Sequence, residues 1–154
     1  MKKIIIILSI SFCSISVFAQ NIVAENMLLF QRSIGGWPKH YQEKKIDYNK
    51  VYSVAEKATI KDEFNRNDAT IDNDATTKEI RYLLKAYKET NNKDFLVAAE
   101  NGIKYLLLAQ YNNGGWSQFY PDLSSYRHLI TYNDNAMINV LNMLYDLGKQ
   151  INNF

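Results

Sequence analysis

The sequence has little of what several common classes of protein chemistry require. Its 154 residues include one cysteine, two histidines and two prolines. The cysteine, Cys13, lies in an apolar stretch near the N-terminus, so the rest of the chain has no disulfide and no cysteine metal site. The histidines, His40 and His128, stand far apart and form no zinc-binding H-x-x-x-H pattern. Glycine patterns that bind nucleotide phosphates are also absent, so nucleotide chemistry has no support.

The first 19 residues have the pattern of a secretory signal peptide. Lys2 and Lys3 precede an apolar run that is too short and too rich in serine for a membrane span. Small residues at positions −3 and −1, Val17 and Ala19, predict cleavage after Ala19. We therefore expect residues 1–19 to be removed and the protein to be exported, either secreted or periplasmic, without a membrane anchor.

The remaining chain, residues 20–154, carries no excess of either charge. Loss of Lys2 and Lys3 reduces the 18 basic residues to the number of acidic residues, 16. Proteins that bind nucleic acid usually carry a basic patch and a net positive charge, so nucleic acid is not expected as a partner. The length and a hydrophobic content of 47% predict one globular domain.

Helical periodicity dominates the sequence that follows the signal. Three segments have apolar residues at i, i+3, i+4 and i+7, and two weaker helices are also expected. The three strong segments start at Thr76, near Asp94 and after Asp134, and the weaker ones lie in 22–32 and 52–64. Thr76 and Glu79 match the capping box that begins many helices. No stretch alternates with period two, so we predict an all-α fold.

An internal repeat organises these helices. The motif Q-x-x-x-G-G-W occurs at 31–37 and again at 110–116. Each copy is followed by a polar cluster that leads into a helix, T-I-D-N-D-A at 70–75 and T-Y-N-D-N-A at 131–136. Repeated helical hairpins pack side by side, because each hairpin buries a face against its neighbour. We expect a partial α/α toroid whose Gly-Gly-Trp loops gather at one end.

The two polar clusters hold the most concentrated oxygen ligands of the chain, Asp72, Asn73, Asp74, Asn133, Asp134 and Asn135. Carboxylate and amide oxygens from separate loops suit a hard cation such as Ca²⁺. Asp and Asn are also favoured at helix N-caps, so the spacing alone leaves capping and metal binding both open. The clusters lack the spacing and the terminal glutamate of an EF-hand loop.

Trp37 and Trp116 each follow two glycines, and two roles are open for them. Tryptophans in an exported, aromatic-rich protein can stack on sugar rings. Alternatively, each indole packs between helical hairpins while the glycines permit a tight turn. Lys39 comes two residues after Trp37, and it is either simply solvated or placed to meet an anionic substrate.

Four ordered blocks of sequence together resemble the family 10 pectate lyases. The blocks are M-L-L-F-Q-R-S-I-G-G-W-P-K at 27–39, T-I-D-N-D-A-T-T at 70–77, N-G-G-W-S-Q-F-Y-P at 113–121 and I-T-Y-N-D-N-A-M at 130–137. The resemblance covers nearly all of residues 20–154, but only the N-terminal part of that family's catalytic domain. It implies an α/α toroid that cleaves polygalacturonate, the backbone of pectin, by calcium-dependent β-elimination.

The resemblance also implies roles for individual residues. Asp72 and Asp134 correspond to aspartates of the family's calcium and substrate cleft and are expected to bind Ca²⁺. Substrate binding is expected at Asn73, Trp37, Lys39 and Trp116.

The family's catalytic base is an arginine in its C-terminal half, beyond residue 154, so no catalytic residue is assigned in this chain. We therefore expect low or no lyase activity from this chain alone. The alternative is a non-catalytic pectin-binding protein or a degenerate fragment of such an enzyme.

Overall fold

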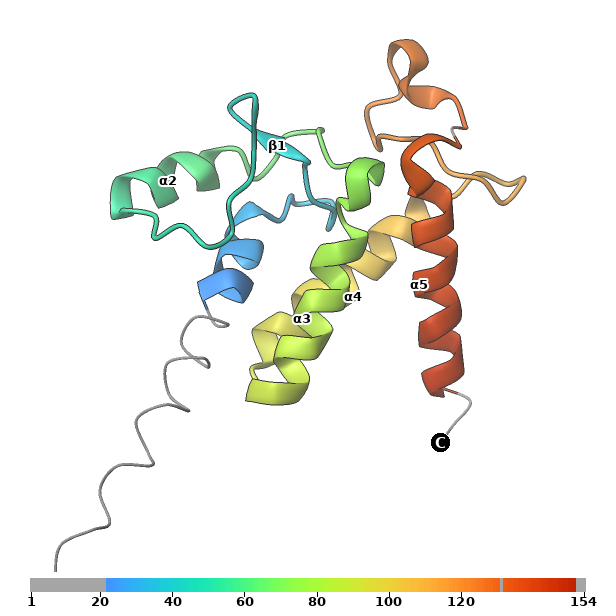
Figure 1. The fold of residues 1–154 in the computed structure, drawn as a ribbon. Coiled ribbons are helices and arrows are strands. Elements are labelled where there is room, and N and C mark those ends of the chain that lie inside the picture. Colours follow the sequence, from blue (N-terminus) through green and yellow to red (C-terminus); the bar gives the residue numbers. More distant parts are fainter. Residues whose placement is uncertain (1–21, 131, 152–154) are drawn as a thin grey trace, which may run out of the picture.

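Helices dominate the protein, so the predicted all-α fold is confirmed (Figure 1). The computed structural model describes residues 22–130 and 132–151, and the expected signal peptide lies outside them. A helix covers residues 22–30, and the labelled helices are α2 (Val54–Asp62), α3 (Thr77–Thr90), α4 (Lys93–Leu108) and α5 (Ala136–Ile151). Short 3₁₀ turns are η1 (Asp72–Asp74), η2 (Ser125–His128) and η3 (Asn133–Asn135). Each expected helix is therefore present, and none within the described part of the chain is long and apolar enough to cross a membrane.

A two-residue turn joins α3 to α4 and makes them neighbours. Asn91 ends α3 in the left-handed conformation, with its N–H bonded to the carbonyl of Tyr87 at 2.7 Å. Asn92 caps α4 by accepting a hydrogen bond from the N–H of Asp94 at 3.0 Å. The facing sides of the two helices then bury Ile80, Leu83 and Ala86 of α3 and Phe95, Ala99 and Leu106 of α4.

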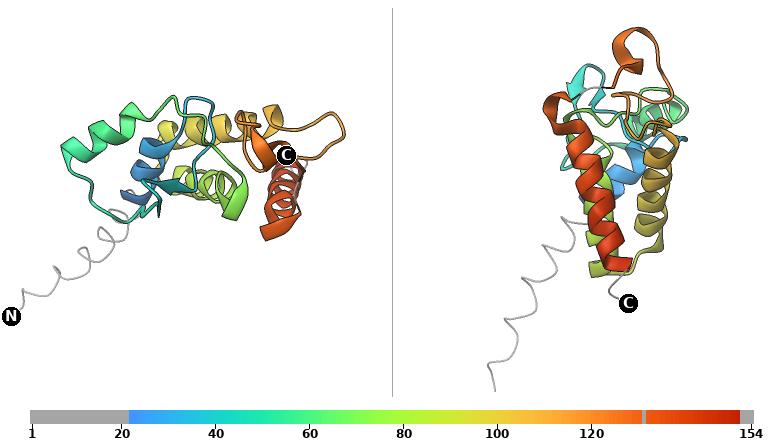
Figure 2. Two further views of the ribbon diagram at one scale, coloured as in Figure 1. Left: turned by 90° about the horizontal axis from the view of Figure 1, so that it is seen from above. Right: turned by 90° about the vertical axis from the view of Figure 1, so that its right-hand side faces the viewer.

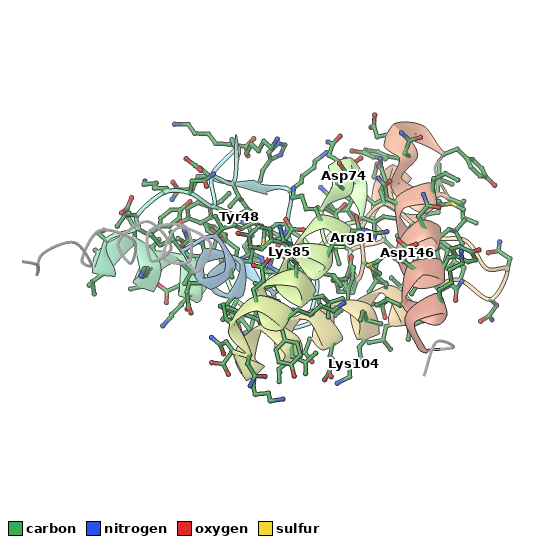
Figure 3. All side chains as sticks on the ribbon, turned by 60° about the horizontal axis from the view of Figure 1, so that its bottom comes forward. Tyr48, Asp74, Arg81, Lys85, Lys104 and Asp146 are labelled. Atoms are coloured by element: carbon green, nitrogen blue, oxygen red, sulfur yellow. The ribbon has the colours of Figure 1, made fainter. Side chains whose placement is uncertain are left out.

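Helix α5, the third of the helices predicted from clear periodicity, packs against α3. Arg81 on α3 pairs with Asp146 on α5 at 2.8 Å (Figure 3). The N-termini of α3 and α5 point to the same end of the molecule, where η1, η3 and the β1–β2 hairpin also lie (Figures 1 and 2). The turns that contain the two polar clusters therefore lie at the same end of the molecule.

Apolar surface on α4 and α5 remains exposed. Periodicity places Leu141 on the same face of α5 as Val140, but Val140 is buried while Leu141 is exposed. Other exposed apolar side chains are Val97, Leu107 and Leu108 of α4 and Ile138 and Tyr145 of α5. That these helices form part of a toroid stays a prediction.

A small antiparallel hairpin was not expected from the sequence. β1 (His40–Tyr41) pairs with β2 (Lys44–Lys45), with His40 opposite Lys45. Gln42 and Glu43 in the turn have positive φ, as a two-residue hairpin turn requires. Strands of two residues are too short to produce a visible period-two pattern, which is why the sequence does not reveal them.

The capping box predicted at Thr76 and Glu79 is not formed by the Thr76 side chain. The Thr76 hydroxyl accepts a hydrogen bond from the N–H of Trp37 at 3.0 Å and donates to the carbonyl of Thr70 at 2.8 Å. Glu79 is fully buried and accepts a hydrogen bond from the Tyr48 hydroxyl at 2.9 Å. The predicted capping residues thus join α3 to the segments that precede it.

Burial of Glu79 makes the stability of the fold dependent on pH. Burial raises the pKa of the Glu79 carboxyl above its usual value, against the opposing effect of the Lys78 ammonium. A raised pKa means that the folded state binds this proton more tightly than the unfolded state, so stability falls as pH rises through the folded pKa.

We expect Glu79→Gln to raise the midpoint of thermal unfolding near pH 7 by a few degrees, since about 1 kcal/mol shifts it by roughly 2–4 °C in a domain of this size. Near pH 4, where the wild-type carboxyl is already protonated, the two proteins should unfold at similar temperatures. Circular dichroism at both pH values measures this, with Glu100→Gln on the exposed side of α4 as the control. An equal loss of stability at both pH values would contradict the prediction.

Candidate functional site

Both copies of the Q-x-x-x-G-G-W motif fold into the same loop. The Gln31 amide donates to the carbonyl of Gly35 at 2.7 Å, and the Gln110 amide donates to the carbonyl of Gly114 at 3.2 Å. Gly35 and Gly114 have φ of 98° and 85°, a conformation that favours glycine. The repeat seen in the sequence is therefore also a repeat of backbone structure.

The second glycine of each motif packs closely against its neighbours. A Cβ atom at Gly36 would lie 2.9 Å from the Cβ of Ala69, and one at Gly115 would lie 2.6 Å from the side chain of Ile130. Both motifs are thus pressed against the segment that leads to a polar cluster.

Trp37 and Trp116 are fully buried, which corrects the expectation that they bind substrate. The indole N–H of Trp37 donates to the carbonyl of Met27 at 2.7 Å, and that of Trp116 donates to the carbonyl of Leu106 at 2.8 Å. In both cases the acceptor lies ten residues earlier, in the preceding helix. The tryptophans therefore have the packing role, and they fix the loops that follow them.

The two polar clusters form matching turns at the N-termini of α3 and α5. Asn73 in η1 and Asp134 in η3 have φ of 50° and 52°, a region where Asn and Asp are tolerated better than most residues. The N-cap residue of α3 is Thr76 and not a member of the cluster, and its side chain makes no capping bond. In η1, capping therefore does not account for the Asp and Asn residues.

Asp72 stands at the centre of a polar network that joins the two clusters. Its side chain is only 5% exposed, and its Oδ2 pairs with the Lys39 ammonium. Its Oδ1 accepts a hydrogen bond from the Gln118 amide at 3.3 Å, and the same amide lies 3.5 Å from Oδ1 of Asn133. The Asn133 amide in turn donates to the Asp134 carboxylate at 3.1 Å. Asp72 and Asp134 are therefore linked through two amide side chains.

The other residues singled out in the sequence occupy the surroundings of this network. Asn73 and Asp134 are exposed, and Asp74 accepts a hydrogen bond from Asn139 of α5. His40 and His128 are exposed and belong to no histidine pair. No group of three or more His, Cys, Asp and Glu side chains could hold a metal ion among residues 22–130 and 132–151. The site at Asp72 combines carboxylates with amides instead.

A cleft of about 300 Å³ opens beside Lys39. Phe119 lines it, and the Arg127 guanidinium lies 4.7 Å from the centre of the Phe119 ring, with the Lys39 ammonium at 5.9 Å from the same centre. Arg127 also pairs with Asp122, and hydrogen bonds from Ser124 together with this pairing lower the pKa of the Asp122 carboxyl. An aromatic ring with two cations is suited to a carboxylated sugar.

Sequence reasoning missed Gln118, although the repeat contains a signal for it. Lys39 follows Trp37 by two residues, and Gln118 follows Trp116 by two residues. The two side chains thus occupy the same position of the repeat, and both contact the Asp72 carboxylate.

Arg32 holds the segment that leads to Asp72. Its guanidinium is 1% exposed and binds both oxygens of Asp68, with Nε at 2.6 Å and Nη2 at 3.0 Å. Nη2 also lies 3.1 Å from the Glu63 carboxylate. Asp68 is four residues before Asp72, so this buried ion cluster positions the start of η1.

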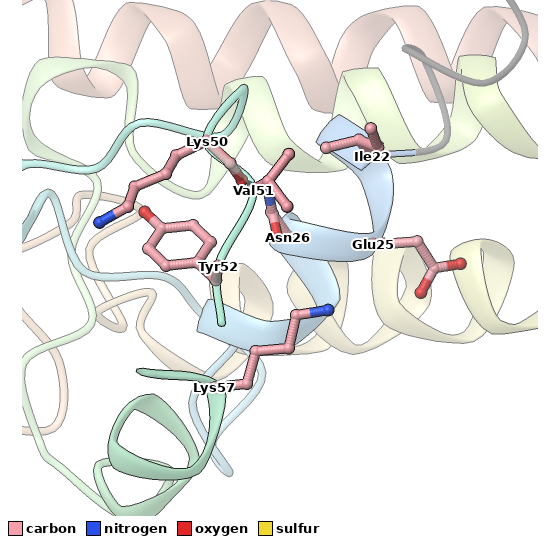
Figure 4. A pocket seen from close by; sticks show the side chains of 7 residues that line it. All are labelled: Ile22, Glu25, Asn26, Lys50, Val51, Tyr52 and Lys57. Atoms are coloured by element: carbon pink, nitrogen blue, oxygen red, sulfur yellow. Dashed lines mark hydrogen bonds between the residues drawn. The ribbon is translucent and has the colours of Figure 1, made fainter. Parts of the chain in front are cut away.

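Another cavity, of about 310 Å³, lies beside the helix at residues 22–30 (Figure 4). Its buried polar group, the Asn26 amide, already donates to the carbonyls of Tyr48 and Lys50 at 2.8 and 2.9 Å. Asn26 therefore fixes the loop around it and offers no free donor to a ligand there.

Comparison with known proteins places these observations in a family. The pectic acid lyase family matches residues 31–154. A mutant family 10 polysaccharide lyase from Cellvibrio cellulosa in complex with trigalaturonic acid is 31% identical with a TM-score of 0.64, over 84% of this chain and 35% of that one. A family 10 polysaccharide lyase from the same organism is 28% identical with a TM-score of 0.65, over 91% of this chain and 41% of that one. No curated protein matches the chain significantly.

Proposed function

The chain belongs to the pectic acid lyase family, and we propose that it provides the calcium- and substrate-binding part of a pectate lyase that degrades polygalacturonate in pectin by β-elimination. The observation that carries this proposal is the buried Asp72 carboxylate, which groups from both sequence repeats contact. The complex of a similar lyase with trigalaturonic acid supports a polygalacturonate ligand. This chain spans only 35% and 41% of the two lyases it resembles.

The donor atoms around Asp72 fit Ca²⁺. Asp72 and Asp134 would supply carboxylate oxygens and Asn133 an amide oxygen, all of them hard ligands that Ca²⁺ prefers. Gln118, whose amide nitrogen faces Asp72 in the structure, would supply its oxygen after the amide turns over. The Lys39 ammonium already places one positive charge on the Asp72 carboxylate. A Ca²⁺ ion bound to the same carboxylate oxygen would take the place of the ammonium.

The reaction removes the C5 proton of a galacturonate residue, which is α to the sugar carboxylate. When bound, Ca²⁺ neutralises that carboxylate and makes the C5 proton more acidic. Lys39 and Asn73 lie beside Asp72 and would bind the sugar and orient it. A base then removes the proton while the C4 oxygen leaves.

The base is not assigned to a residue of this chain, and this gives a testable consequence. We expect purified residues 20–154 to bind oligogalacturonate in the presence of Ca²⁺ but to release little or no unsaturated uronate. Ultraviolet absorbance of the unsaturated product measures this, with a full-length family 10 lyase as the positive control. Robust calcium-dependent product release by residues 20–154 would contradict the prediction.

A non-catalytic pectin-binding protein is the second candidate. It is favoured by the assembly of binding groups around Asp72. Calcium-dependent affinity for polygalacturonate without product formation supports it for the isolated chain. Absence of both affinity and a cooperative unfolding transition indicates a degenerate fragment.

We also propose that the protein is exported, as its polysaccharide substrate requires. Export is supported by the positive charges of Lys2 and Lys3, by the apolar run after them and by the small residues Val17 and Ala19. N-terminal sequencing of protein recovered from the periplasm or the medium is expected to begin at Gln20. Recovery of the protein only inside the cell with Met1 in place would contradict export.

A further inference from the structure

We propose that Lys39 couples the binding of a cation at Asp72 to the binding of a sugar carboxylate in the neighbouring cleft. This inference rests on the proposed function, and it assigns Lys39 a role beyond that of a substrate contact. Lys39 belongs to both places, because its ammonium pairs with Asp72 and its side chain lines the cleft beside Phe119.

The ammonium of Lys39 competes with a cation for the same carboxylate. The Asp72 side chain is only 5% exposed, and Gln118 contacts its other oxygen. A divalent cation that binds Oδ2 must therefore displace the ammonium, since two positive charges cannot occupy the same contact. The displaced ammonium loses its partner, and this opposes cation binding.

The cleft offers the displaced ammonium its best partner when a further anion binds there. Two carboxylates line the cleft, but Asp68 is already bound by Arg32 and Arg66, and Glu43 lies in the exposed hairpin turn. The Lys39 side chain is 28% exposed, and its ammonium is already within 5.9 Å of the centre of the Phe119 ring. The Arg127 guanidinium, which pairs with Asp122, lies near the same ring and is a second cation of the lining. A sugar carboxylate between Lys39 and Arg127 would pair with both cations.

The two ligands therefore assist each other. Without an acidic sugar, Lys39 stays on Asp72 and weakens cation binding. Without a cation, Asp72 retains Lys39 and weakens sugar binding. When both ligands are present, the cation neutralises Asp72 and the sugar carboxylate neutralises Lys39, and the coupling must be equal in both directions.

The test is the calcium affinity of the protein, measured by calorimetry with and without trigalacturonate, after subtraction of the calcium that the sugar binds alone. In the wild type we expect trigalacturonate to tighten calcium binding by about tenfold, within the usual range of coupling between sites. The uncharged methyl ester of the same sugar should not do so. This arm needs no variant, and equal effects of the acid and the ester would overturn the proposal.

Substitution of Lys39 isolates its role from direct contact between sugar and cation. Lys39→Met is expected to bind Ca²⁺ about tenfold more tightly than the wild type without sugar and to lose most of the coupling. Lys39→Gln, which keeps a hydrogen-bond donor toward Asp72, serves if the first variant does not fold. Lys44→Met, on the exposed hairpin strand β2, is the matched control and should behave as wild type.

The outcomes separate this inference from the proposed function. Unchanged calcium affinity in Asp72→Asn means that the cation site is wrong, and the proposed function then fails together with this inference. The other outcome is calcium binding that requires Asp72 and yet shows the same affinity and the same coupling in the Lys39 variants as in the wild type. That result leaves the cation site in place and overturns only the role of Lys39.

Discussion

Asp72→Asn is expected to lower the calcium-dependent affinity for oligogalacturonate by at least about a hundredfold, because loss of even an outer-shell partner of a metal costs about 10–100-fold. The asparagine has nearly the same shape as the aspartate, so the packing of η1 is retained. It lacks the negative charge that a hard cation requires. Calorimetric titration with trigalacturonate in saturating Ca²⁺ measures the effect.

Asp74→Asn is the matched control, because it changes the same residue type within the same turn. The Asp74 side chain is directed to Asn139 of α5 rather than to Lys39 or Gln118. We expect the affinity of the Asp74→Asn variant for oligogalacturonate to stay within about twofold of the wild type. This is less than the tenfold change that corresponds to about 1.4 kcal/mol. Equal losses in the two variants would show that the whole turn matters and that Asp72 has no special place in it.

Arg32→Met is expected to destabilise the protein by about 3 kcal/mol, the lower end of the cost of breaking a buried ion pair. The substitution leaves the carboxylates of Asp68 and Glu63 without their buried partner. Both side chains are about one quarter exposed or less, and both keep a contact with Arg66, so we expect the lower end of this cost. The midpoint of thermal unfolding should fall by roughly 6–12 °C, given about 2–4 °C for each kcal/mol in a domain of this size. Differential scanning calorimetry measures both quantities.

Arg66→Met provides the comparison for Arg32, because Arg66 pairs with the same two carboxylates from an exposed position. Exposed ion pairs contribute about 0–1 kcal/mol, so this variant should unfold close to the wild-type temperature. Arg32→Lys should recover only part of the stability, since lysine cannot bind both Asp68 oxygens in the planar manner of arginine. Similar stabilities of the Arg32→Met and Arg66→Met variants would contradict the positioning role of Arg32.

The helices were largely predictable because each follows from local periodicity and from clear end signals. The segments that begin at Thr76 and near Asp94 became α3 and α4 within a residue or two. The capping box failed for a non-local reason: the side chains of Thr76 and Glu79 bond to Trp37 and Tyr48, which are distant in the sequence. A local motif cannot reveal such partners.

The candidate site was predictable in part. The polar clusters offered six candidate oxygen ligands, and the resemblance to family 10 pectate lyases singled out Asp72 and Asp134 among them. The structure joins these two residues through Gln118 and Asn133. The repeat also contained the position of Gln118, because this residue is the counterpart of Lys39.

Two features of the site could not be read from sequence. The burial of Trp37 and Trp116 follows from contacts with preceding helices, and an aromatic residue after two glycines fits a buried or an exposed ring equally well. The meeting of Phe119, Arg127 and Lys39 depends on the pairing of the segments around Thr70 and Phe119. These segments are far apart in the sequence, so only the fold brings them together.

The most direct test of the calcium and polygalacturonate site is a crystal structure of the protein grown with Ca²⁺ and trigalacturonate. We predict a cation bound to the carboxylates of Asp72 and Asp134, with the Lys39 ammonium moved from Asp72 to a sugar carboxylate in the cleft beside Phe119. A sugar bound elsewhere, or a cation bound elsewhere while Lys39 still pairs with Asp72, would contradict it.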